Sequence, residues 1–125
     1  GLGYVKLEIT EIPMSHSEII ASFAYADVAL LPYLPNKSTE NCIPAKMYEY
    51  IAHQIPMIVQ HNLIWEEVCA SCQAAIFIDF NHFEASTLIE SLRDKAFYST
   101  GDVSFALWEC EEYKFIHLIR SNLFD

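Results

Sequence analysis

Three short apolar runs alternate with longer segments of helical pattern in the middle of this chain, and this alternation constrains the fold most. The runs cover residues 27–31, 56–60 and 75–79, and none alternates cleanly between apolar and polar side chains. Strands buried on both faces have this pattern and form parallel sheets in α/β domains. A run at residues 4–9 does alternate, as a strand does. We therefore predict an α/β fold, a Rossmann-like parallel sheet of four strands with helices on both faces.

Helix-start signals separate the expected strands. Ser15 and Glu18 have the spacing of a capping box. Pro44 suits the first position of a helix, where its missing N–H costs nothing. We expect one domain over residues 1–125, with an α/β core at 1–103 and a last helix at 104–125. The expected helices cover residues 15–26, 44–53, 64–71, a segment that begins near 81, and 104–121.

The composition excludes several classes of protein. Seven Lys and Arg against seventeen Asp and Glu give a net charge of −10, which repels phosphate backbones and argues against nucleic acid as a partner. Hydrophobic residues make up 53% of the chain, yet no stretch approaches the roughly 20 apolar residues of a membrane span. The start of the chain lacks the pattern of a signal peptide. The expected location is therefore cytoplasmic.

Cys69 and Cys72 form a C-x-x-C motif, so a redox or metal site has to be weighed. A structural zinc site needs two further ligands with their own short spacing, and Cys42 and Cys110 stand alone. A thioredoxin-type pair opens a helix directly after a strand. Here Cys69 follows a segment that is already helical. We therefore favour reduced, buried cysteines and expect no metal.

The helix that begins at Pro44 combines a polar face with a helix start suited to anions. Lys46 and Glu49 lie on one polar face, and the backbone N–H groups at a helix start carry a partial positive charge. Because Lys46 has the wrong sign for that position, it indicates an anion that shares the site. The alternative is an exposed face with a weak Lys46–Glu49 pair.

Several segments together resemble the donor-binding half of the GT-B glycosyltransferases, and more narrowly the retaining enzymes called group 1. The resemblance covers roughly residues 15–95, and its most specific part combines a strand, a loop and a helix. The matching segments are residues 26–33, the loop pair Glu40 and Asn41, and Pro44, Ala45, Lys46, Glu49, Tyr50, Ala52 and Pro56. The resemblance implies a domain that binds a nucleotide-sugar.

The resemblance also implies roles for individual residues. The glutamate matching Glu49 holds the ribose, and the lysine matching Lys46 lies near the phosphate or sugar. Residues 41–43 would face the sugar and diphosphate through Asn41, Cys42 and Ile43, with Glu40 or Asn41 on the sugar. Such enzymes usually need no metal, because helix dipoles and basic side chains stabilise the leaving diphosphate. The expected ligand is thus a nucleoside diphosphate sugar, and no catalytic residue is assigned.

The sequence departs from the family pattern in three places. Many members carry a second glutamate where Asn41 stands, which would change the preference for the sugar hydroxyl. Gln54 and Gln73 occupy positions near usual glycines. A non-glycine residue in a left-handed conformation there costs about 1 kcal/mol.

The resemblance also implies partners. The acceptor-binding domain and the basic residues that grip the diphosphate would precede this segment, so the chain alone is expected to be inactive. The full enzyme would build polysaccharide or glycolipid and could associate peripherally with a membrane. The apolar last helix predicts a contact surface, and this surface could drive the isolated chain to form a homodimer. Two alternatives stay open: a non-catalytic interaction module that lost the donor site, and a C-x-x-C redox domain.

Overall fold

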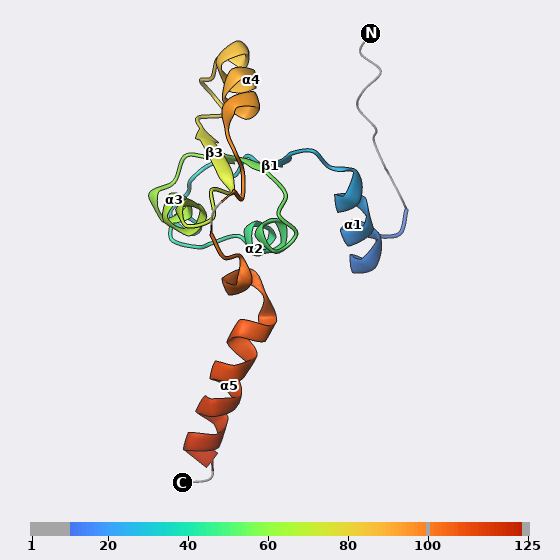
Figure 1. Ribbon diagram of the computed structural model, residues 1–125, viewed down its shortest axis with the longest axis vertical. Helices are drawn as coiled ribbons and strands as arrows, with labels where there is room; N and C mark the ends of the chain where they lie inside the picture. Colours follow the sequence, from blue (N-terminus) through green and yellow to red (C-terminus); the bar gives the residue numbers. More distant parts are fainter. Residues whose placement is uncertain (1–10, 100, 124–125) are drawn as a thin grey trace.

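The computed structural model describes residues 11–99 and 101–123, which form an α/β fold around one parallel sheet (Figure 1). The sheet has the order β1-β2-β3 and confirms the three apolar runs as strands. The strand predicted at residues 4–9 lies outside the described residues. The strands are β1 (Ala29–Leu31), β2 (Met57–Gln60) and β3 (Ala75–Ile78), with Ala29 opposite Met57 and Met57 opposite Ala75.

One face of the sheet forms the hydrophobic core. The two crossover helices, α2 (Ala45–Ala52) and α3 (Leu63–Ala70), pack on this face. Helix α2 connects β1 to β2, and α3 connects β2 to β3. Two crossover connections of the same handedness that run in the same direction along a sheet place their helices on the same side of it. The largest fully buried side chains include Met47, Ile51, Met57 and Val59, all with 2% exposure or less.

The opposite face of the sheet is covered less. Leu30 of β1 is 57% exposed, although Ile58 of the central strand is buried. Helix α4 (Ala85–Asp94) stands beside Ile76 and Ile78 of β3 across a cavity of about 250 Å³. Within the described residues, the prediction of helices on both faces is therefore confirmed fully for one face and partly for the other.

The N-terminal helix stands apart from the sheet (Figure 1). Helix α1 (His16–Ser22) begins with the predicted capping box: the Ser15 N–H donates to Glu18 Oε2 at 2.7 Å, and the Glu18 N–H donates to Ser15 Oγ at 3.3 Å. A 3-10 turn, η1 (Phe23–Tyr25), follows. The Phe23 ring meets Tyr50 of α2 and the following residue His53 edge-on, each at 5.3 Å between centroids.

The last helix projects away from the core (Figure 1). It follows the 3-10 turn η2 (Ser104–Ala106) and runs as α5 (Trp108–Leu123). The helix was expected from residue 104, but Leu107 has extended backbone angles (φ −94°, ψ 139°), so the α-helix begins one residue later. Among the described residues, no helix has the length and apolar character needed to cross a bilayer.

Left-handed residues end two of the helices. Gln54 (φ 54°) follows α2, where the Ile55 N–H donates to the Tyr50 carbonyl and the Gln54 N–H to the Ile51 carbonyl, both at 2.9 Å. These two bonds are a Schellman motif, which usually has glycine at this position. Gln73 (φ 55°) follows α3 in the same conformation. Gln54 thus adopts the left-handed conformation that the family resemblance implies for this position, and Gln73, predicted to lie in a turn, adopts it as well.

Candidate functional site

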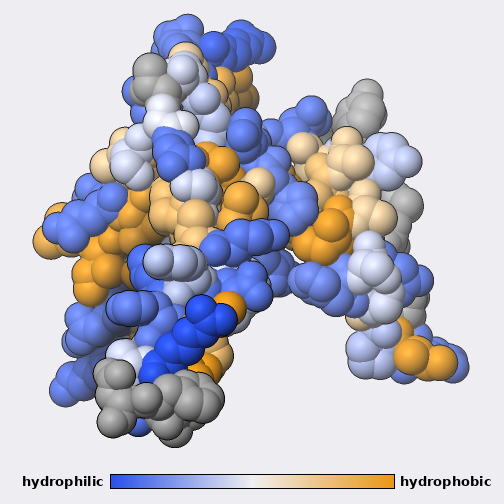
Figure 2. Space-filling view, turned by 60° about the horizontal axis from the view of Figure 1, so that its bottom comes forward, coloured by the Kyte–Doolittle hydropathy of each residue, from blue (hydrophilic) through white to orange (hydrophobic). Residues whose placement is uncertain are grey.

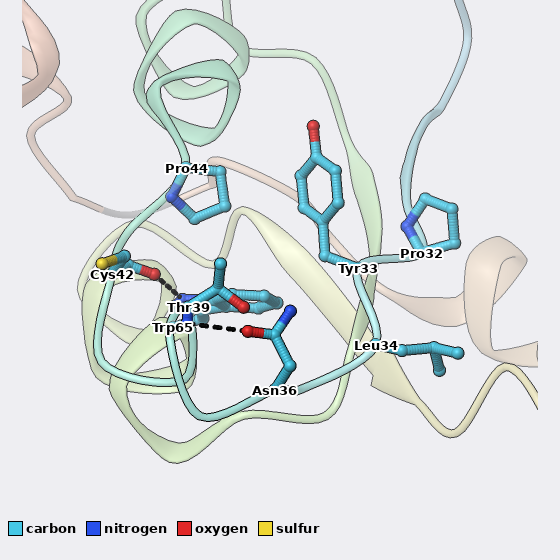
Figure 3. Close-up of a pocket in the computed structure, with 8 residues that line it drawn as sticks. All are labelled: Pro32, Tyr33, Leu34, Asn36, Thr39, Cys42, Pro44 and Trp65. Atoms are coloured by element: carbon cyan, nitrogen blue, oxygen red, sulfur yellow. Dashed lines mark hydrogen bonds between the residues drawn. The ribbon is translucent and has the colours of Figure 1, made fainter.

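The carboxyl end of β1 opens into a cavity of about 460 Å³, here called the loop cavity (Figure 3). It lies between the loop after β1, the start of α2 and the α3 residue Trp65. Ligands of open α/β sheets bind at this edge, outside the carboxyl ends of the strands. The lining consists of Pro32, Tyr33, Leu34, Asn36, Thr39, Cys42, Pro44 and Trp65.

Two hydrogen bonds fasten the loop of residues 36–43 to α3. Asn62 caps α3 with its Oδ1, and its Nδ2 donates to the Glu40 carbonyl at 3.1 Å. The indole Nε1 of Trp65 donates to the Cys42 carbonyl at 2.8 Å (Figure 3). Within the loop, Asn36 Oδ1 accepts from the N–H of Thr39 at 3.1 Å. The far wall of the loop cavity is therefore held by polar contacts as well as by packing.

Two aromatic rings form the apolar wall of the loop cavity. Tyr33 and Trp65 meet edge-on, with 6.4 Å between centroids and an interplanar angle of 78°. Trp65 is 3% exposed and belongs to the core, yet one side of its ring borders the loop cavity. In Figure 3 the Tyr33 hydroxyl points toward α2.

The start of α2 offers hydrogen-bond donors and one cation. Pro44 is the N-cap residue and provides no side-chain cap, and the N–H groups of Ala45 and Lys46 have no acceptor within the described part of the chain. Lys46 Nζ donates to Glu49 Oε2 at 2.8 Å. This hydrogen bond and the charge of Glu49 raise the pKa of Lys46, so the ammonium stays charged.

A second cavity, here called the helix cavity, lies between α2 and the start of α5. It has a volume of about 610 Å³, and Glu49 lines it together with aromatic side chains. Since the adjacent residues Pro44 and Ala45 line the loop cavity and the helix cavity respectively, both cavities flank the first turn of α2. The full lining is Ala45, Tyr48, Glu49, Phe105, Ala106, Leu107, Trp108 and Glu111.

The predicted site residues do not surround a single cavity. Cys42 lines the loop cavity and Glu49 lines the helix cavity. Glu40 and Asn41 have exposed side chains, and Ile43 packs against the core instead of facing solvent. Lys46 and Glu49 are brought together, although their contact is with each other. Their side chains are 37% and 29% exposed, so the pair is less solvated than the simple surface-pair interpretation assumed.

Sequence reasoning missed most of the loop-cavity lining. Asn36, Thr39 and Trp65 line the loop cavity and were not among the predicted site residues. A usable signal was present, because Tyr33 directly follows the β1 strand and Pro32. Residues just past the carboxyl end of a parallel strand are the first candidates for a binding site.

The C-x-x-C pair has the properties of structural cysteines. Cys69 and Cys72 are both free and buried, and Cys69 Sγ lies 3.9 Å from Met47 Sδ. Burial raises the pKa of Cys69 to about 12 and also raises the pKa of Cys72. A reactive cysteine needs a depressed pKa and access to solvent. These observations weigh against the redox alternative.

No group of three or more metal-ligating side chains occurs among residues 11–99 and 101–123. In comparisons with known proteins, no protein family matched the sequence, and no curated protein and no solved structure matched the chain. The site is therefore interpreted from its geometry and from the sequence pattern.

Proposed function

We propose that this chain is the nucleotide-sugar-binding domain of a glycosyltransferase with a Rossmann-like GT-B donor domain. The observation that carries the proposal is the pair of cavities that flank the first turn of α2, next to two N–H groups without an acceptor. An extended ligand with an anion at its middle fits that arrangement, because the helix start favours negative charge. A nucleoside diphosphate sugar has this shape and charge.

Each part of such a ligand has a suitable environment. The diphosphate would take the N–H groups of Ala45 and Lys46 and the Lys46 ammonium. The nucleoside would lie in the helix cavity, where the Glu49 carboxylate can accept hydrogen bonds from two ribose hydroxyls. The sugar would enter the loop cavity against Tyr33, with the Cys42 segment beside it. Binding would then exchange the Lys46–Glu49 contact for two contacts with ligand.

The proposal can be tested by ligand-observed NMR on the whole chain with UDP, GDP, ADP and the matching nucleosides. We expect one nucleotide to bind in preference to the others. Glu49→Gln should weaken binding of the nucleotide and of its nucleoside alike, whereas Lys46→Met should weaken binding of the nucleotide only. Glu67→Gln is the matched control, because Glu67 is exposed on α3 and lines neither cavity. If no nucleotide binds, or if both site variants bind like the control, the proposal is wrong.

A second candidate function is a non-catalytic interaction module. The observation in its favour is the large apolar area left exposed on α5, where Trp108 is 63% and Leu118 is 60% exposed. This candidate predicts no nucleotide binding and a protein partner for α5. The same NMR titration therefore separates the two candidates.

A further inference from the structure

Helix α5 carries an apolar stripe that nothing in the described part of the chain covers. Its 16 residues contact the rest of the chain mainly through η2, and Cys110 is its one half-buried side chain among residues 108–122. Figure 2, in which α5 comes toward the viewer, shows apolar side chains exposed among strongly polar ones. The α5 stripe consists of Trp108, Phe115 and Ile119, flanked by Ile116 and Leu118.

The stripe follows from helical spacing. Phe115 and Ile119 stand seven and eleven residues after Trp108, close to two and three full turns, so all three point the same way. The Trp108 and Phe115 rings are already in contact, with 6.3 Å between centroids. A helix of about this length is marginal in water by itself, and a packed apolar face supplies most of the stability of helices in proteins. We therefore expect the α5 stripe to pack against a partner surface.

The acidic side chains of α5 all lie in its first half. That half carries Glu109, Glu111 and Glu112 together with Lys114, and the second half carries Arg120. Lys114 pairs with Glu111 at 2.7 Å, whereas Glu109 and Arg120 have no ion pair within the described residues. Because Glu109 and Arg120 are eleven residues apart, about three turns, they lie on the same flank of the α5 stripe.

We infer that α5 pairs with α5 of a second copy of this chain in antiparallel orientation. A two-fold axis near Phe115 would place Glu109 of each copy beside Arg120 of the other, and Trp108 beside the far end of the partner's stripe. Opposite helix dipoles also favour this orientation. In a parallel pair the same flank of the two helices lies on opposite sides of the interface, so Glu109 and Arg120 would gain no partner of opposite charge there. The match between Glu109 and Arg120 therefore favours a second copy in antiparallel orientation as the partner of α5.

This pairing does not require a bound nucleotide, although Trp108 belongs both to the α5 stripe and to the lining of the helix cavity. Two helices of this length bury less surface than the roughly 1,200 Å² at the lower end of standard protein interfaces, so we expect a dimer of about micromolar affinity. Sedimentation velocity over a concentration series tests this, with a dimer of twice the 14.3 kDa chain mass as the expected product. A chain that stays monomeric up to its solubility limit would overturn the inference and leave α5 to a different partner.

Charge exchange tests the orientation. Glu109→Arg and Arg120→Glu each create two like-charge contacts in an antiparallel dimer and should weaken it about tenfold. The double variant with both changes should dimerise like the original chain, as should an equimolar mixture of the two single variants. Glu67→Arg on α3 is the control for charge, and circular dichroism checks the helix content.

Each outcome is informative. In a parallel dimer positions 109 and 120 do not meet across the interface, so the single variants would not weaken it, and that result refutes the antiparallel orientation. A weakening that the double variant fails to reverse also refutes it, because the contact between positions 109 and 120 would then be absent. Phe115→Gln tests the apolar contact independently of charge. This variant should abolish the dimer, and a dimer that persists would contradict the role of the α5 stripe.

Discussion

Replacing Gln54 with glycine should stabilise this protein. Gln54 sits after α2 with φ at 54°, a conformation in which its β-carbon crowds the backbone. The left-handed conformation costs a non-glycine residue about 1–2 kcal/mol. Gln54→Gly removes that cost. Glycine also loses more backbone entropy on folding, which offsets roughly 0.5–1 kcal/mol of the stabilisation. The expected net gain is about 0.5–1 kcal/mol in the free energy of unfolding.

No other interaction complicates this estimate. The Gln54 side chain is exposed and makes no hydrogen bond within the described residues. Both hydrogen bonds of the Schellman motif come from backbone groups, so Gln54→Gly keeps them. Gln73 shows the contrast: its Oε1 accepts from Ser99 Oγ at 2.6 Å, and Gln73→Gly would lose that bond. A net hydrogen bond contributes about 1 kcal/mol, so Gln73→Gly should be near neutral.

Urea unfolding followed by circular dichroism measures the effect. With a slope of about 1–3 kcal/mol per molar urea, the midpoint for Gln54→Gly should rise by a few tenths of a molar. Gln54→Ala is the matched control, because alanine keeps the β-carbon and removes only the exposed amide. If Gln54→Gly is no more stable than Gln54→Ala, backbone strain is not the cause and the reasoning fails.

Three other predictions follow from single features of the fold. A β-carbon at Gly101 (φ 116°) would lie 2.2 Å from the Ser71 carbonyl oxygen, so Gly101→Ala should lower the unfolding free energy by about 1–3 kcal/mol, measured by urea unfolding. Exposed Cys42 should react with a thiol reagent in the folded state while Cys69, with its pKa near 12, stays protected until urea is added. The Glu84 carboxylate accepts hydrogen bonds at the start of α4, which lowers its pKa from 4.5 to about 2. Its stabilising effect should be complete above pH 4.5 and fade as the pH falls toward 2, and carboxyl NMR titration would contradict this if the midpoint lay near 4.5.

Local signals in the sequence predicted most of the fold. The capping box at Ser15 and Glu18 involves residues three positions apart, and it is present in the structure. The left-handed residue Gln54 was anticipated from the family resemblance, and Gln73 was placed in a turn. The second sheet face was harder to anticipate. Four strands and helices on both faces were expected, but cover on that face depends on where α4 docks, and no local pattern encodes that placement.

The segments that border the loop cavity were predicted from the sequence, but its lining was predicted only in part. The loop after β1 and the start of α2 were identified from their order in the chain, and both border the loop cavity. The ties that shape the loop cavity were not identified, because Asn62 and Trp65 reach the carbonyls of Glu40 and Cys42 across 22 and 23 residues. Contacts of that separation follow from packing of whole elements, so one sequence could not reveal them.

Those two long-range ties affect how the protein folds. The loop of residues 36–43 cannot take its final shape until α3 has docked, since Asn62 and Trp65 hold it from that helix. The wall of the loop cavity should therefore form late, after the sheet and its two helices have assembled. Contacts made after the folding transition state change the unfolding rate and leave the folding rate almost untouched. A molecule bound there should lengthen the lifetime of the folded chain without helping it to fold.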